Sequence, residues 1–159
     1  MTTINERLWE RRLAGDSVWL VEAYAAWCPA CKAFMPTYLQ AAELMRDDDV
    51  EVGAVNCERN SRICADWLSV RAYPTVLLVN REHGIVQLYD EDAPRTAEAM
   101  REWALRVAAE WRYLFSTSTA LHLDAAAFGE NVLADETCAW LVMFTDGLAC
   151  SPCLSLIHI

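Results

Sequence analysis

The sequence predicts an α/β fold in which a mixed central sheet is flanked by helices, followed by the truncated start of a second domain of the same kind. Three observations support this prediction. Short apolar runs alternate with segments of helical periodicity. Hydrophobic residues make up 55% of the 159 residues, which is enough to bury a core. Trp140–Val142 repeats Trp19–Val21, and each copy precedes a Cys-x-x-Cys pair, which indicates an internal repeat.

The first part of the first copy alternates helices with strands. Apolar residues recur at helical spacing in three segments, the first of which is stopped by Gly15. Two apolar runs between these segments are typical of buried strands. We expect helices over 4–14, 28–45 and 59–69, and strands over 18–24 and 50–56.

The remainder of the first copy is typical of a hairpin followed by a long helix. Arg81–Gly84 has turn composition and separates two apolar runs. Beyond it, apolar side chains follow one helical stripe from Ala97 to Trp111. We expect strands over 75–80 and 85–89 and a helix over 94–114.

We expect the chain to divide into four segments. We also expect it to be a fragment of a longer protein. We expect a first domain over 1–115 that lacks its first strand, and a polar linker over 116–119. The N-terminal part of a second domain follows over 120–153. A common transposase sequencing adapter, read in frame, encodes residues 154–159, so we expect this tail not to belong to the natural protein.

Charge and hydropathy exclude several classes of partner. The net charge of −10 disfavours nucleic acid, because a phosphate-binding face needs clustered lysine and arginine. The sequence contains no apolar run of the length needed to span a bilayer, so we expect no membrane insertion of this fragment. Seven cysteines in 159 residues favour an oxidising compartment, although a cytosolic redox protein stays an alternative.

The first cysteine pair lies where an apolar strand leads into a helix, in Trp27-Cys28-Pro29-Ala30-Cys31. Free N–H groups and the helix dipole at such a position stabilise the thiolate of the first cysteine. The second cysteine, one turn later, can then resolve a mixed disulfide. Half of a zinc site is the alternative. Zinc needs a second ligand pair, and the seven-residue separation of Cys57 and Cys64 is poor for that purpose.

Residues 19–31, Trp-Leu-Val-Glu-Ala-Tyr-Ala-Ala-Trp-Cys-Pro-Ala-Cys, together with Ala72-Tyr-Pro-Thr75, resemble the thioredoxin-fold domains of the protein disulfide isomerase family. Within that family the first copy is similar to the J-domain-bearing disulfide reductases that contain several thioredoxin domains. The resemblance implies a thioredoxin fold and a thiol–disulfide oxidoreductase of the endoplasmic reticulum lumen. Its partners would be proteins with disulfides or thiols, in oxidative folding or quality control, and no metal or organic cofactor would be needed.

The resemblance also implies catalytic roles. Cys28 would be the nucleophile and Cys31 the resolving thiol, while Glu22 would be the buried acid that accepts the proton of the resolving thiol. A glutamate of an edge strand that faces water is the alternative for Glu22. Ala54 stands where the family usually has a lysine near this acid, so we expect altered proton handling.

Four positions match the substrate-binding part of the family motif. Pro74 matches a cis-proline that presents backbone to the substrate, and Tyr73 and Thr75 flank it. Trp27 matches the tryptophan that lines the substrate groove, with a core aromatic as the alternative. These residues predict binding of an extended polypeptide beside Cys28.

The remaining cysteines have other expected roles. Cys57 and Cys64 match a structural disulfide of several family members, and two buried thiols are the alternative. Cys138 has no clear partner.

The second copy offers a weaker redox site at Cys150 and Cys153. Met143 and Ala149 stand where the first copy has its acid and its tryptophan. A degraded site of this kind also fits the alternative function, a non-catalytic thioredoxin-fold module that binds substrates within a larger chaperone.

The dipeptide between the cysteines indicates the redox direction. Pro29-Ala30 lacks the histidine that favours the thiolate of the first cysteine in many oxidising family members. Less thiolate stabilisation makes a disulfide less oxidising, so the sequence favours a reductase or isomerase over an oxidase.

Overall fold

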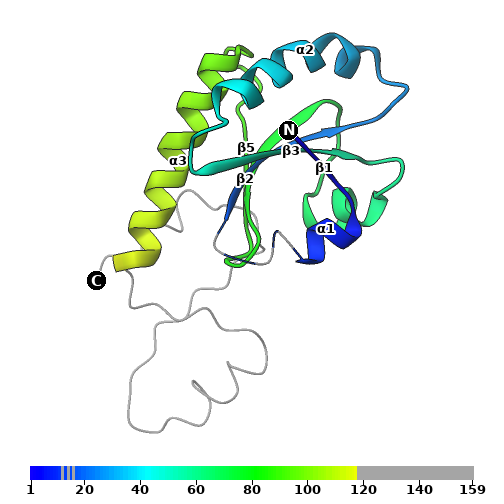
Figure 1. Cartoon of the computed structure of the whole chain (residues 1–159). Helices are drawn as coiled ribbons and strands as arrows, with labels where there is room; N and C mark the ends of the chain where they lie inside the picture. Colours follow the sequence, from blue (N-terminus) through cyan, green and yellow to red (C-terminus); the bar gives the residue numbers. More distant parts are fainter. Residues whose placement is uncertain (12, 14, 16, 118–159) are drawn as a thin grey trace, which may run out of the picture.

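The computed structural model describes residues 1–11, 13, 15 and 17–117, which form a mixed five-stranded sheet with two helical layers (Figure 1). The strand order is β1-β3-β2-β4-β5. β1 and β2 are parallel to β3, whereas β4 is antiparallel to both β2 and β5. The strands are β1 (Thr2–Ile4), β2 (Val18–Tyr24), β3 (Val50–Asn56), β4 (Thr75–Asn80) and β5 (Ile85–Leu88). The expected mixed α/β sheet is confirmed.

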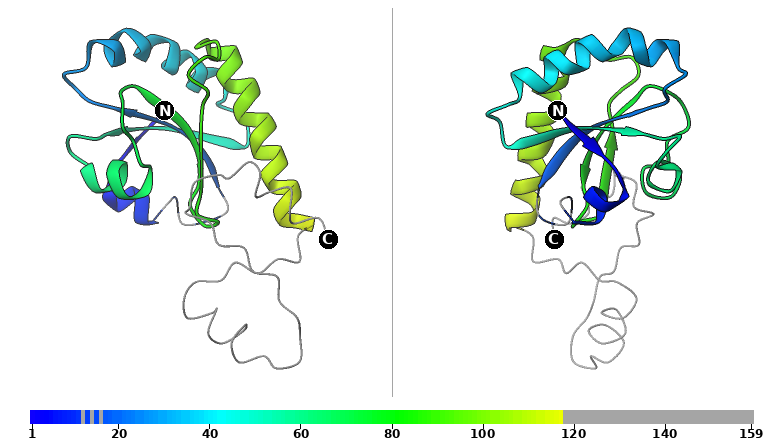
Figure 2. Two further views of the ribbon diagram at one scale, coloured as in Figure 1. Left: turned by 180° about the vertical axis from the view of Figure 1, so that it is seen from behind. Right: turned by 45° about the vertical axis from the view of Figure 1, so that its right-hand side comes forward.

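Helices cover both faces of this sheet (Figure 2). The two long helices, α2 and α3, pack on one face around a core that includes Tyr38, Met100 and Trp111. A smaller core around Trp9 and Ile63 fills the other face. The helices are α1 (Glu6–Arg11), α2 (Pro29–Leu44), the π-helical turn η1 (Ile63–Trp67) and α3 (Ala97–Thr117).

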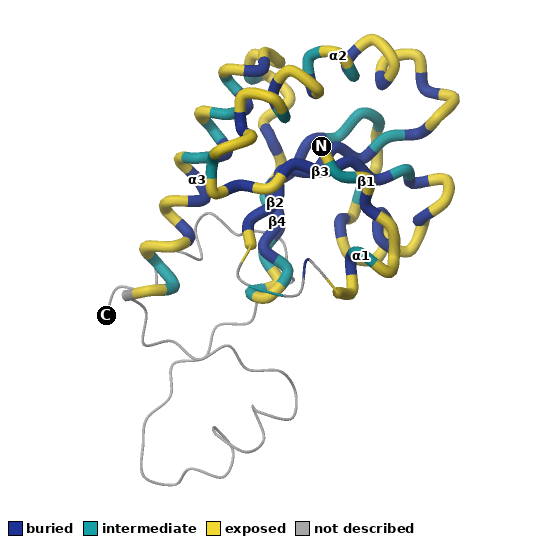
Figure 3. Tube along the Cα trace, viewed as in Figure 1, coloured by how far each residue is buried: buried dark blue, intermediate teal, exposed yellow. Residues whose placement is uncertain are grey.

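β2 is the central strand and carries the chain to the cysteine pair. It is paired along both edges, and its residues Val18 to Ala23 are buried (Figure 3). Leu20 belongs to the core under α2, and Val21 to the core on the opposite face, as strand alternation requires. A strand covered on both faces is apolar throughout, which explains why its bounds are predictable from sequence. Glu22 is the exception, a charged residue that is fully buried in this strand.

The N-terminus differs from the sequence expectation. We expected a helix over 4–14 and no strand before it, whereas Thr2–Ile4 form β1 and the helix covers only Glu6–Arg11. β-Branched residues favour the strand, and Ile4 is fully buried on the sheet. Asn5 then starts the helix, because its side-chain oxygen accepts a hydrogen bond from the Leu8 amide at 2.9 Å. The short helix expected over 59–69 is present over 61–67, and its residues Ile63–Trp67 form a π-helical turn.

Gly53 permits the close approach of β1 to β3. A Cβ atom at this position would lie 2.6 Å from Ile4 Cδ1 and 3.2 Å from the Thr2 carbonyl oxygen. We expect Gly53→Ala to lower the free energy of unfolding by about 1–3 kcal/mol, because the buried Ile4 side chain has no free space to enter. Chemical denaturation measures this change.

Ile4→Val supplies the control for this prediction, because it removes the atom nearest to the added methyl group. The cost of Gly53→Ala should be smaller in the Ile4→Val background than in the native chain. Strict additivity of the two changes would contradict the steric explanation.

Candidate active site

The cysteine pair lies at the junction of β2 and α2. Cys28 is the N-cap of α2, with extended backbone (φ −73°, ψ 115°), and Pro29 follows within the first turn. Proline suits this position because the first helical amides have no partner inside the helix. The backbone amide of Cys31 donates a hydrogen bond to Cys28 Sγ at 3.2 Å. The sulfur of Cys28 therefore takes the capping position that an Asp or Ser oxygen fills in other helices.

The two thiols are free and differ in their surroundings. Cys28 is 5% exposed and Cys31 2% exposed, and both pack with Ala25. The Cys28 thiol also donates to the Tyr73 carbonyl oxygen, 3.8 Å away. Cys28 thus lies between the start of α2 and the loop before β4.

The pKa values of the two thiols move in opposite directions. The pKa of Cys28 is lowered, first by the hydrogen bond from the Cys31 thiol and then by backbone amides at the helix start. Burial, with the hydrogen bond to Cys28 as the next cause, raises the pKa of Cys31 to about 11. The thiolate of Cys28 therefore forms more readily than the thiolate of Cys31.

Glu22 is a buried acid in the middle of β2. It is fully buried, and neither of its carboxyl oxygens has a hydrogen-bond partner among the residues that the structure describes. Burial raises its pKa to about 7. Its neighbours across the sheet are Ala54 on β3 and Val76 on β4, so no cation faces it from these two register positions. The alternative of a water-facing glutamate on an edge strand is wrong, because β2 is central.

Glu22 influences the pKa values of both cysteines electrostatically. Its charge contributes to the raised pKa of Cys31 and works against the lowered pKa of Cys28. With a pKa of about 7, Glu22 itself can gain or lose a proton near neutral pH. The structure therefore places a titratable acid within electrostatic reach of both thiols.

The loop before β4 forms the other side of the site. The Tyr73–Pro74 peptide bond is cis. Thr75, at the start of β4, donates from Oγ1 to the Ala72 carbonyl oxygen at 2.7 Å, which closes the turn. Trp27 is 64% exposed and its ring stands edge-on to Tyr73, with 6.1 Å between ring centroids. Trp27 is therefore no core aromatic, and its ring contacts Tyr73, which packs against the cluster of Ala25, Cys28 and Cys31.

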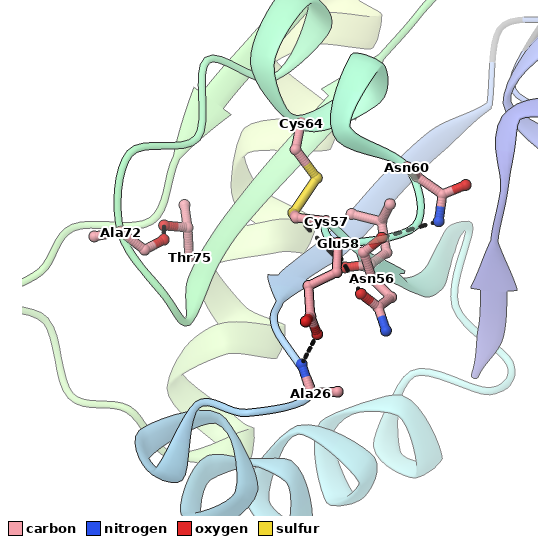
Figure 4. Close-up of a disulfide and its surroundings, with 9 residues drawn as sticks. Ala26, Asn56, Cys57, Glu58, Asn60, Cys64, Ala72 and Thr75 are labelled. Atoms are coloured by element: carbon pink, nitrogen blue, oxygen red, sulfur yellow. Dashed lines mark hydrogen bonds between the residues drawn. A yellow bond between two sulfur atoms is a disulfide. The ribbon is translucent and has the colours of Figure 1, made fainter.

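A second cysteine pair is bonded near this site. Cys57 and Cys64 form a disulfide, with 5.6 Å between their Cα atoms, which ties the end of β3 to η1 (Figure 4). Because these sulfurs are bonded to each other, they are not a second ligand pair for zinc. In the described ranges, no three His, Cys, Asp or Glu side chains gather as a metal site. Cys138, Cys150 and Cys153 lie outside the described residues.

Two residues of the site have no signal in the sequence. The Tyr38 hydroxyl reaches from α2 to the carbonyl oxygens of Leu20 and Gly53, at 2.9 and 2.8 Å, and so fixes the helix on the sheet. Glu58 Oε2 accepts a hydrogen bond from the Ala26 amide at 2.7 Å, across 32 residues of sequence. Both residues make contacts that depend on tertiary structure, and no local sequence pattern predicts these contacts.

Residues 1–105 match the family described as Thioredoxin. The chain belongs to the thioredoxin family. This thioredoxin-family chain is 27% identical over 154 residues to the DnaJ homolog subfamily C member 10 of Rattus norvegicus, covering 96% of the chain. It is 33% identical over 93 residues, 58% of its length, to the protein disulfide-isomerase A6 homolog of Drosophila melanogaster.

A relative of known structure is similar to this chain in both sequence and fold. The first thioredoxin domain of mouse protein disulfide-isomerase A4 is 27% identical, with a TM-score of 0.57, and the match covers 67% of this chain and 74% of that one. The resemblance to disulfide isomerases and to J-domain proteins is thereby confirmed. The thioredoxin-family chain spans only 18% of the rat relative and 21% of the fly relative. Within the part of the chain that is described, no helix is both long and apolar enough to cross a bilayer.

Proposed function

We propose that residues 1–117 act as a thiol–disulfide oxidoreductase on protein disulfides, working as a reductase or isomerase. The observation that carries the proposal is the position of the Cys28 sulfur at the start of α2, where it accepts the Cys31 amide at 3.2 Å. The pKa values of the two thiols accordingly move in opposite directions. A thiolate attacks a disulfide, whereas a buried protonated thiol does not compete with it. Hydrogen bonds lower the pKa of Cys28, and no cation is among the causes. Because a cation would stabilise the thiolate further and make the disulfide more oxidising, its absence from these causes fits the reducing direction better.

The reaction would run in two exchanges. The Cys28 thiolate attacks one sulfur of a substrate disulfide, forms a mixed disulfide and releases the other substrate sulfur as a thiolate. Cys31 then loses its proton to Glu22 and attacks Cys28 Sγ, which releases the second substrate thiolate. The enzyme is left with a Cys28–Cys31 disulfide, and a dithiol reductant returns both electrons for the next cycle.

Substrate would bind along the surface formed by Trp27, Tyr73, Pro74 and Thr75. The exposed Trp27 ring and the Tyr73 ring offer an apolar contact beside the nucleophile. Such contacts suit an unfolded chain, which presents apolar side chains and unpaired backbone groups. We therefore take proteins with accessible disulfides as the partners.

The endoplasmic reticulum lumen is the compartment we propose. The Cys57–Cys64 disulfide supports it, because structural disulfides persist in oxidising compartments and are rare in the cytosol. The match to disulfide-isomerase relatives points the same way.

A non-catalytic binding module is the second candidate, and the exposed Trp27–Tyr73 pair supports it. Turnover of a protein disulfide, followed with a dithiol reductant present, separates the two functions. The native chain should accelerate reduction, and the Cys28→Ser/Cys31→Ser chain should bind the unfolded substrate without any acceleration. Equal rates for both chains, with binding retained, would favour the binding module over the enzyme.

A further inference from the structure

Glu58 joins the second cysteine pair to the catalytic loop. Its carboxylate accepts the Ala26 amide at 2.7 Å, and Figure 4 shows this side chain extending from the turn beside the disulfide to Ala26. Only Trp27 separates Ala26 from Cys28. A hydrogen bond from an amide to a carboxylate is shorter and stronger than one between neutral groups. The contact therefore holds the loop immediately before the nucleophile.

The loop has few other internal constraints at this point. The Cys28 amide donates to the Ala25 carbonyl oxygen at 3.1 Å, which closes a tight turn around Ala26 and Trp27. Both residues of that turn are exposed. A contact to the amide inside the turn thus fixes the direction in which the chain enters α2.

Glu58 is itself held firmly. Its backbone amide donates to Asn56 Oδ1 at 3.0 Å, and the Asn60 side chain donates to the Asn56 carbonyl oxygen at 2.9 Å. Next to it, the Cys57 amide donates to the Tyr24 carbonyl oxygen at 2.9 Å, and the Cys57 sulfur is bonded to Cys64. The anchor is therefore part of a hydrogen-bonded turn that is tied to β2 by a backbone hydrogen bond and to η1 by the disulfide.

We propose that Glu58 is a positioning residue of the dithiol site, which holds the Ala25–Trp27 loop so that Cys28 Sγ stays within reach of the Cys31 amide. A positioning role for Glu58 rests on the proposed function of Cys28. The hydrogen bond between Glu58 and the Ala26 amide does not depend on that function. Glu58 acts through the loop, and no hydrogen bond joins it to either catalytic sulfur. The function proposed for Cys28 then depends on a carboxylate that belongs to the turn of the structural disulfide.

A positioning role and an electrostatic role for Glu58 predict opposite changes in the pKa of Cys28 when the residue is replaced. A nearby anion raises the pKa of a thiol, so an electrostatic role for Glu58 means that removing its charge lowers the pKa of Cys28. A positioning role means that losing the contact raises this pKa, because the hydrogen bond from the Cys31 amide weakens. Glu58→Asp keeps the charge and shortens the reach by one methylene group. Glu58→Gln removes the charge and keeps an oxygen that accepts the Ala26 amide.

The experiment measures the alkylation rate of Cys28 against pH in the full chain, with Cys28 and Cys31 reduced and the Cys57–Cys64 disulfide intact, and each cysteine is read separately by mass spectrometry. Glu51→Gln, an exposed carboxylate at the other end of β3, is the matched control. Hydrogen exchange of the Ala26 amide is recorded on the same proteins. This second readout does not depend on redox activity.

We expect Glu58→Asp to raise the midpoint of the Cys28 rate profile by about half a pH unit, which is a loss of about threefold in rate below the midpoint. Exchange of the Ala26 amide should become faster in the same variant. Glu58→Gln and Glu51→Gln should stay close to the native chain in both readouts. A lowered midpoint in Glu58→Gln, or a native profile in Glu58→Asp, would overturn the positioning role. Failure of the proposed function looks different, because the native chain itself would then lack a lowered midpoint.

Discussion

Cys31→Ser is expected to capture substrate proteins on Cys28 as stable mixed disulfides. The structure leaves Cys28 with its amide donors in this variant, so the first exchange still occurs. The second exchange needs the Cys31 sulfur and cannot occur. Adducts that persist and disappear on treatment with excess dithiothreitol should therefore build up toward one per chain, whereas the native chain should show only traces. Non-reducing electrophoresis and intact mass measure the adduct.

Cys28→Ser is the matched control for this result. It preserves the size of the site and removes the attacking sulfur, so we expect neither adducts nor turnover. The protonated Cys31, with its pKa of about 11 and an exposed fraction of 2%, should not replace the missing nucleophile. Adducts on Cys31 in the Cys28→Ser chain, at the level found for Cys31→Ser, would contradict the assigned roles.

Glu22→Gln is expected to change how the stability of the fold depends on pH. The pKa of Glu22 is about 7 in the fold and 4.5 without burial, so the folded state holds the proton more tightly. The contribution of Glu22 to stability is therefore fully present below about pH 4.5, and about 3 kcal/mol of it is lost as the pH rises to about 7. Glutamine does not titrate, so the stability of the variant relative to the native chain should increase by that amount over the same range.

Denaturant unfolding at about pH 4 and about pH 7.5 measures this difference. Taking the variant minus the native chain at each pH cancels every cost of the substitution that does not depend on pH. Glu51→Gln, on the surface of the neighbouring strand, is the control. It measures how the loss of one exposed carboxylate changes the pH dependence of the free energy of unfolding. A difference for Glu22→Gln that is the same at both pH values would show that Glu22 is solvated in solution and would remove it as a proton acceptor.

The central sheet could be predicted from the sequence because its strands are buried on both faces. β2, β3 and β4 have the expected bounds, since covered strands consist of mainly apolar runs between turns. The N-terminus was mispredicted for the opposite reason. Three residues of an edge strand are too few for a periodic signal, and the apolar residues that follow suggested one longer helix.

The candidate site was predictable only where local sequence encodes it. The Cys28–Cys31 pair, the buried Glu22 and the Tyr73–Pro74 turn stand in short motifs, and the fold brings them together. Glu58 could not be found in this way, because its partner Ala26 is 32 residues away and is linked to it only by the pairing of β2 with β3. Carboxylates are common on surfaces, so their type alone indicates no role.

The central claim is that Cys28 is an activated nucleophile beside a protected Cys31. The most direct test is the pH dependence of alkylation at each cysteine of the reduced native chain. We predict a midpoint for Cys28 well below the value of about 8.5 for a free thiol, while Cys31 stays unreactive over the same range. Equal reactivity of the two cysteines, with midpoints at the free-thiol value in a folded chain, would contradict the claim.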